Sequence, residues 1–196
     1  MKISIERATL LKAVAQAQSV VERRNTIPIL SNVLIEAAEG GSVKVMATDL
    51  DLQVVENMAA ASVESPGAVT VSAHLLFDIA RKLPDGSQVS LETSDNRMEV
   101  KAGRSRFKLP TLPRDDFPVI VEGGRPTSFA LPAKTRAEMI DRTRFAISTE
   151  ETRYYLNGVY MHVADAAGGQ VLRCVATDGH RLARIDADLP SGAQSL

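Results

Sequence analysis

The sequence predicts an α+β protein built from tandem copies of one domain, in which a full copy consists of two βαβββ halves. Short runs with apolar residues on alternate positions, typical of strands, alternate with single helix-like segments. A Thr-Asp pair closes a strand-like run twice, at Thr48 and at Thr177, 129 residues apart. Residues 30–34 are likewise matched by residues 156–160. This period exceeds the roughly 20 to 50 residues of a solenoid repeat, so it indicates duplication of a whole domain.

The composition is that of an ordinary globular protein. Of 196 residues, 44% are hydrophobic and 24% are charged, which is enough apolar material for a core. No apolar run approaches the roughly 18 residues of a membrane span, and residues 1–5 lack the hydrophobic region of a signal peptide. We therefore expect a cytoplasmic protein with no membrane partner.

The formal net charge of −1 limits the ways in which the chain can bind nucleic acid. A salt-driven, sequence-specific DNA binder needs an excess of basic side chains, whereas a protein that holds DNA by its shape does not. The single cysteine, Cys174, lies in a strand-like run, and we expect it to be a small buried hydrophobe rather than a reactive thiol.

The first domain is predicted to span residues 1–124. Its first half has a strand at 3–5, a helix at 7–21, and strands at 33–37, 43–48 and 52–58. Its second half has a strand at 68–71, a helix at 73–83, and strands at 89–93, 97–102 and 105–109. Ser72 is a good N-cap for the second helix. The helical period directs Leu11 and Ala15 of the first helix inward, and Leu75 and Leu76 of the second.

Residues 109–126 are rich in proline and glycine, which is typical of an interdomain connection. A third half follows, with strands at 128–131, 155–163, 170–176 and 181–186 and a helix at 133–147. Met139, Ile140 and Ile147 are predicted to lie together on this helix, and Arg136 interrupts their apolar stripe. Because no fourth half follows, the second domain, residues 125–196, is expected to be incomplete.

An enzyme built on the Thr-Asp turns is the competing interpretation. Asp49 and Asp51 could share one face, as could Asp178 and His180, but neither pair has a third metal ligand at an ordered spacing. Neighbours in a turn cannot form the line of nucleophile, base and orienting group that a hydrolase needs, and no Gly-x-Ser-x-Gly elbow is present. We expect no catalytic residue, no metal and no cofactor.

Five sequence segments together resemble the β sliding clamp family of bacterial DNA polymerase III. They are residues 26–30, 82–86, 103–107, 153–158 and 176–183. The resemblance implies tandem DNA-clamp domains, three per subunit, in a ring of two subunits whose helices line a central hole and whose antiparallel sheets lie outside. Such a homodimer encircles double-stranded DNA without sequence preference and is a processivity factor, not an enzyme. Its partners would be the polymerase III catalytic subunit, the clamp loader, and other polymerases and repair proteins that carry short linear motifs.

The resemblance also assigns a peptide-binding pocket. Its residues would be Leu156, Thr177, Gly179, His180, Arg181 and Leu182. A glycine turn exposes backbone groups, and the two leucines offer an apolar floor for aliphatic anchors. The alternative is a plain hairpin turn with a solvated histidine and arginine. Residues 50–52 replace the Gly-His-Arg of this turn in the first domain, so we expect no equivalent pocket there.

Further residues match the family's DNA path and subunit interface. The DNA-contacting positions would be Arg24, His74, Tyr154 and Tyr155, with one of the two tyrosines in the core. Glu150 stands where the family can carry an amide, and its carboxylate would repel phosphate. The interface positions would be Arg104, Arg106, Phe107 and Leu109, with the two apolar side chains packing on the partner. The alternative for that strand is an edge protected by charge.

Overall fold

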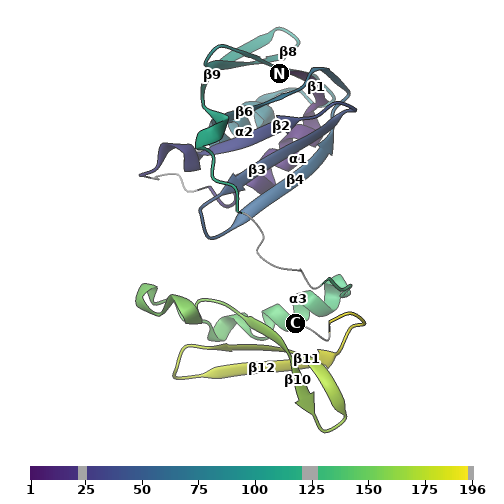
Figure 1. The fold of residues 1–196 in the computed structure, drawn as a ribbon, viewed down its shortest axis with the longest axis vertical. Helices are drawn as coiled ribbons and strands as arrows, with labels where there is room; N and C mark the ends of the chain where they lie inside the picture. The colour runs from purple at the N-terminus through teal and green to yellow at the C-terminus, as the bar shows by residue number, and fades with distance from the viewer. Residues whose placement is uncertain (22–25, 121–127, 194–196) are drawn as a thin grey trace. The chain divides into compact units, whose positions relative to one another are not determined.

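The computed structural model describes residues 1–21, 26–120 and 128–193. The chain divides into two compact units, Met1–Glu122 and Gly123–Leu196 (Figure 1). No helix among the described residues is long and apolar enough to cross a bilayer.

The first unit contains nine strands and two α-helices among its described residues. The strands are β1 (Lys2–Glu6), β2 (Asn32–Ala37), β3 (Ser42–Thr48), β4 (Gln53–Ala59), β5 (Ser62–Ser65), β6 (Gly67–Ser72), β7 (Gln88–Ser94), β8 (Arg97–Ala102) and β9 (Ser105–Leu112). The helices are α1 (Arg7–Gln18) and α2 (Ala73–Lys82). This order confirms the two predicted βαβββ halves, to which the structure adds the short strand β5.

The two halves exchange their first strands. The sheet order is β4-β3-β2-β6-β9-β8-β7-β1-β5, and every pairing is antiparallel. Strand β1 of the first half pairs with β7 of the second, and β6 of the second half pairs with β2 of the first. Because β1 and β6 each pair with a strand of the other half, the two halves form one domain with one main core.

Both helices pack on one face of this sheet and against each other (Figure 1). The carboxylate of Glu6 accepts a hydrogen bond from the Thr9 amide at 2.9 Å, and the Ser72 hydroxyl, as predicted, caps α2. The buried positions are Leu10, Ala13, Val14 and Ala17 in α1 and Ala73, Leu76 and Ala80 in α2.

The predicted phase of both helices was partly wrong. Ala15 is exposed and Leu75 is 51% exposed. Alanine fills most of the buried positions because small side chains let the helices approach closely. Since alanine is only weakly hydrophobic, the sequence pattern did not mark these positions as buried. The exposed side of α1 includes Lys12 and Gln16 and is polar.

The predicted interdomain connection begins too early. Strand β9 continues to Leu112, and a short 3-10 helix, Arg114–Asp116, follows it. The Arg114 guanidinium donates to one Glu36 carboxylate oxygen at 2.7 and 3.0 Å, and Phe117 is buried in a small cluster. Proline and glycine punctuate this stretch, but one buried aromatic side chain and one ion pair attach it to the first unit.

The second unit contains α3 (Ala133–Asp141) and the sheet β10-β11-β12, formed by Tyr160–Ala166, Gly169–Thr177 and Leu182–Asp188. Its core joins Met139, Leu172 and Cys174. Burial raises the pKa of the Cys174 thiol, which fits the predicted buried role. The helix is shorter than predicted: just beyond its end the Thr143 amide donates to the Ile140 carbonyl at 3.1 Å, and the Thr143 hydroxyl, instead of this amide, donates to the Met139 carbonyl at 2.8 Å.

Three further expectations for the second unit were wrong. Ile140 is 39% exposed and does not share a cluster with Met139. Arg136 is exposed and therefore interrupts no apolar stripe. Residues 128–131 form no strand. In the first unit the corresponding strand, β1, is held by β5 and β7, and the described part of the second unit supplies no such partners.

Candidate functional site

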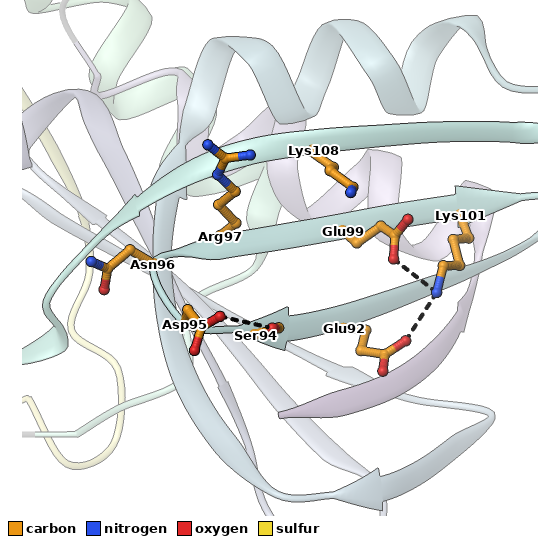
Figure 2. Close-up of a pocket in the computed structure, with 8 residues that line it drawn as sticks. All are labelled: Glu92, Ser94, Asp95, Asn96, Arg97, Glu99, Lys101 and Lys108. Atoms are coloured by element: carbon orange, nitrogen blue, oxygen red, sulfur yellow. Dashed lines mark hydrogen bonds and ion pairs between the residues drawn. The ribbon is translucent and has the colours of Figure 1, made fainter.

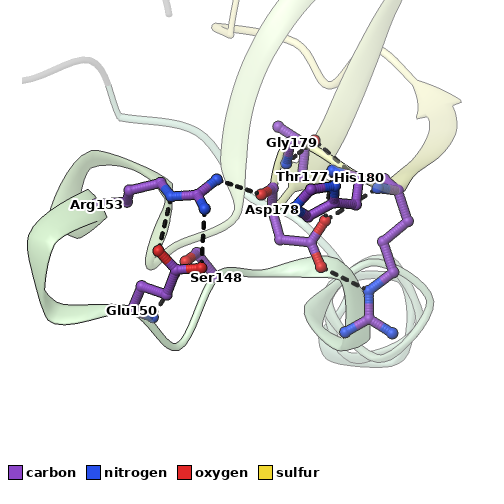
Figure 3. A network of polar contacts seen from close by, with 8 residues as sticks. Ser148, Glu150, Arg153, Thr177, Asp178, Gly179 and His180 are labelled. Atoms are coloured by element: carbon purple, nitrogen blue, oxygen red, sulfur yellow. Dashed lines mark hydrogen bonds and ion pairs between the residues drawn. The ribbon is translucent and has the colours of Figure 1, made fainter.

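The Thr-Asp turn of the second unit joins β11 to β12 and is held by its own side chains (Figure 3). The Thr177 hydroxyl accepts from the Gly179 amide at 3.1 Å and donates to the Arg181 carbonyl at 2.8 Å. One Asp178 carboxylate oxygen accepts from the amides of His180 and Arg181, both at 2.9 Å, and the other accepts from Arg181 Nε at 2.9 Å. These bonds lower the pKa of Asp178 to about 2, the two backbone amides contributing most.

The bonding of Asp178 argues against the enzyme interpretation. Its carboxylate binds backbone amides and a guanidinium instead of orienting the His180 imidazole. No group of three or more potential metal-ligating side chains occurs among the residues that the structure describes. The charged groups of Asp178 and Arg181 thus have structural partners within the turn itself.

The Thr-Asp turn of the first unit shares three of these hydrogen bonds. The Thr48 hydroxyl accepts from the Leu50 amide at 3.0 Å, and one Asp49 carboxylate oxygen accepts from the amides of Asp51 and Leu52 at 3.0 and 2.6 Å. The central residue has φ +83° at Leu50 and +88° at Gly179. The internal repeat read from the sequence is therefore a repeat of backbone conformation, although a leucine stands in one copy where glycine stands in the other.

A second segment, the 3-10 helix Glu151–Leu156 (η4), lies against the turn of the second unit. Arg153 Nη1 donates to the Asp178 carbonyl at 3.0 Å, and the Arg153 guanidinium also forms a two-bonded pair with Glu150 (Figure 3). The Leu156 carbonyl accepts from the Ser148 amide at 3.0 Å, which closes the base of this loop. The structure thereby brings the segment of Leu156 to residues 177–182, as the peptide-pocket prediction requires.

Apolar side chains are exposed beside this turn. Leu182 is 65% exposed, and Leu156 is half-buried. Phe145, which is 58% exposed, lies under the Arg181 guanidinium with 5.9 Å from the Cζ atom to the ring centroid. Phe145 is not among the predicted site residues, because its position in a predicted helix gave no signal. Exposed apolar side chains around a rigid polar turn are what a docking site for a short peptide needs.

The predicted DNA-contacting residues have different surroundings. Arg24 lies outside the described residues. His74 is half-buried in a groove that Gln18, Ser31 and Arg81 also line. Both tyrosines are exposed, Tyr154 by 78% and Tyr155 by 71%, and their rings meet edge to face. The expectation that one tyrosine lies in the core was wrong because they belong to η4 and the strand begins only at Tyr160.

The predicted interface residues lie along β9 and the turn before it. Residues 105–110 pair with β8, and β9 meets β6 only at Thr111 and Leu112. Residues 105–110 therefore have no strand on their second edge within the described chain. Arg104 and Arg106 are exposed and Phe107 is 38% exposed, but Leu109 is 3% exposed and belongs to the core. The structure thus corrects the assignment of Leu109, whose side chain is not free to pack on a partner.

A polar hollow lies beside this strand, on β7, β8 and β9 (Figure 2). Lys101 Nζ bonds the carboxylates of Glu92 at 3.0 Å and Glu99 at 2.9 Å. The two carboxylates raise the pKa of Lys101, and Lys101 lowers the pKa of Glu99. Basic and acidic side chains alternate here, so this surface is charged without being strongly basic.

Comparisons with known proteins agree with this architecture. The family models of the DNA polymerase III beta subunit match residues 1–121 as its N-terminal domain and residues 130–195 as its central domain. A beta sliding clamp of Caulobacter vibrioides is 54% identical over 198 residues, covering 100% of this chain and 53% of the relative.

Solved structures give the same result. The beta subunit of polymerase III from Caulobacter crescentus has a TM-score of 0.95 and 53% identity, over 100% of this chain and 52% of that chain. A sliding clamp from Bartonella birtlesii bound to griselimycin has a TM-score of 0.89 and 48% identity, with the same coverage. The chain spans about half the length of the relatives that it matches.

Proposed function

Because the chain belongs to the DNA polymerase III beta subunit family, we propose that the protein acts as a sliding clamp that encircles duplex DNA in the bacterial cytoplasm. In this role it is a non-catalytic processivity factor, and dissociation from DNA requires the ring to open. The exposed polar side of α1 and the basic end of α2, with Arg81 and Lys82, would make mobile contacts to phosphate. A net charge of −1 suits this mechanism because encirclement, not attraction, keeps the protein on DNA.

We further propose that the turn at residues 177–182, with Leu156, binds the short linear motifs of the polymerase catalytic subunit, the clamp loader and other replication or repair proteins. The observation that carries this proposal is the 65% exposure of Leu182 on a turn that its own side chains hold rigid. A rigid turn loses little entropy on binding, so burying one leucine contributes fully to affinity.

The test is a calorimetric titration of the full-length protein with a synthetic peptide that carries the clamp-binding motif of the polymerase catalytic subunit. Removing most of a buried leucine side chain costs about 1.5 to 3 kcal/mol of contact, so Leu182→Ala should weaken binding about tenfold or more. His180→Ala should weaken it as well. Leu52→Ala is the matched control, since Leu52 is 61% exposed at the corresponding turn of the first unit. Equal affinities for Leu182→Ala and wild type would remove the pocket assignment.

A further inference from the structure

We infer that Glu150 is a positioning residue for the peptide site and that it acts through Arg153. This inference rests on the proposed function of the turn at residues 177–182. The sequence alone gave Glu150 no positive role, because it placed the carboxylate only at a position expected near DNA.

The Arg153 guanidinium donates three hydrogen bonds that link Glu150 to the turn. The Glu150 carboxylate accepts from Arg153 Nε and Nη2, both at 2.8 Å, and Arg153 Nη1 donates to the Asp178 carbonyl at 3.0 Å (Figure 3). A fork of two parallel bonds fixes the plane of the guanidinium as well as its position. With that plane fixed, the third donor points at the turn.

The turn is in close contact with the same guanidinium. A Cβ atom added to Gly179 would lie 3.2 Å from Arg153 Nη1, which is tighter than an ordinary van der Waals contact. The φ of +88° at Gly179 already favours glycine at this position. Arg153 therefore donates a hydrogen bond to the turn and also occupies the space that a side chain at position 179 would need.

The same bridge controls the position of Leu156. Arg153 stands at a kink in η4, with φ −109° and ψ 45°, so hydrogen bonding along the helix does not by itself fix the position of the residues after the kink. The loop is tied at its start, where the Ser148 hydroxyl accepts from the Glu150 amide at 3.1 Å, and at its base by the bond from Ser148 to Leu156. The link from Glu150 through Arg153 to Asp178 then sets the distance between Leu156 and the turn.

The pairing with Arg153 also reduces the negative charge that Glu150 presents to DNA. Its carboxylate is half exposed, but the charge of Arg153 lies within hydrogen-bond distance of both oxygens. The pair presents little net charge to a passing phosphate. Repulsion of DNA, which the sequence alone predicted for this carboxylate, is thus largely offset within the pair.

The experiment is the same peptide titration of the full-length protein, with four variants. Glu150→Ala should weaken binding about five- to tenfold, the effect of losing one charge-assisted fork, and Arg153→Ala at least as much. Glu150→Gln, whose amide oxygen can still accept one bond from Arg153, should weaken it no more than about twofold. The double variant Glu150→Ala with Arg153→Ala should bind no more weakly than Arg153→Ala alone, because Glu150 acts through Arg153.

Two controls separate positioning from general damage. Glu138→Ala breaks a comparable exposed pair, between Glu138 of α3 and its C-cap Arg142 at 2.9 Å, and should leave peptide affinity unchanged. Affinity for a short DNA duplex, measured by fluorescence anisotropy, should differ less than about twofold between wild type and Glu150→Ala. Circular dichroism of each variant establishes that it is folded before it is titrated.

The outcomes are distinct. If Leu182→Ala weakens peptide binding and Glu150→Ala does not, the role of Glu150 is rejected and the proposed function stands. If the wild type fails to bind the peptide, or Leu182→Ala binds equally well, the proposed function fails. Additive losses in the double variant would mean that Glu150 touches the peptide itself, and tighter DNA binding by Glu150→Ala would mean that it faces DNA; either result overturns the inference.

Discussion

At the scale of single residues, the two Thr-Asp turns show how one backbone conformation can be kept by different residues. The left-handed region costs a residue with a Cβ atom roughly 1 to 2 kcal/mol, and Leu50 carries this cost where Gly179 does not. The side chains of Thr48 and Asp49 hold the turn in this conformation with three hydrogen bonds. The shared turn could be predicted by comparing the sequences of the two copies. The strain at Leu50 could not, because a leucine in the sequence does not indicate a positive φ.

Leu50→Gly should therefore stabilise the first unit. Relief of the strain exceeds the extra entropy that glycine loses on folding, so the free energy of unfolding should rise by up to about 1 kcal/mol. Circular dichroism in guanidinium is the suitable measurement, because the three tyrosines all lie at positions 154–160 and the chain has no tryptophan. Gly179→Ala is the reverse change and should lower stability. A less stable Leu50→Gly variant would show that the leucine side chain contributes packing that outweighs the strain.

The pKa of Asp178 predicts a pH dependence at the other turn. Its folded value of about 2 lies below the ordinary 3.8, so the carboxylate's contribution to stability is complete above about pH 4 and is lost as the pH falls toward 2. The difference in stability between wild type and Asp178→Asn should be constant from pH 7 to 5 and should shrink below about pH 4. Denaturant unfolding at several pH values, followed by tyrosine fluorescence, measures it. A difference that stays constant down to pH 2 would refute the assigned pKa.

At the scale of elements, the positions of strands and helices along the chain could be predicted from the sequence better than the pairing of the strands. Alternating apolar residues located β3 and β8 within a residue of their bounds. The exchange of β1 and β6 between halves could not be predicted, because strand pairing over this separation leaves no local pattern. The strand expected at 128–131 failed for the same reason, since a strand forms only where another completes its ladder. In the candidate site, the turn was predictable from its motif, whereas the bridge from Arg153 to Asp178 depends on a loop fold that the sequence does not reveal.

The free edge of β9 is the element that predicts oligomerisation. Residues 105–110 have one paired and one open edge in the described chain, and Phe107 is 38% exposed beside Arg106. Such an edge is a template for a strand of another subunit. Phe107→Asp should shift the full-length protein from dimer to monomer in sedimentation experiments, because a carboxylate would be buried in the interface. Phe77→Asp is not a suitable control because Phe77 packs on the core, but Leu52→Asp, at an exposed turn, should leave the dimer intact. A dimer that tolerates Phe107→Asp would reject β9 as the interface.

At the scale of the whole molecule, encirclement and direct contact make different predictions about DNA. Contacts by the exposed rings of Tyr154 and Tyr155 with the sugar-phosphate backbone should add affinity for any duplex. The gain should be smaller than the about 1 to 3 kcal/mol of an aromatic stack on a single-stranded base, because the bases of a duplex are already stacked on each other. Encirclement should instead depend only on whether the DNA has ends. Substituting both tyrosines with alanine should therefore weaken equilibrium binding to a short duplex while leaving the lifetime on closed DNA nearly unchanged.

The measurement is the retention of full-length protein that the clamp loader has placed on a nicked circular plasmid. Wild type and the double tyrosine variant should both remain bound through gel filtration at high salt, because screening weakens phosphate contacts but does not open a ring. Cutting the plasmid once with a restriction enzyme should release both within the time of the column run, as the protein slides off the ends. Release from the uncut circle at high salt would mean that contacts, rather than topology, hold the protein. Retention on the linear plasmid would also mean that contacts hold the protein, since a ring that encircles DNA slides off once it reaches an end.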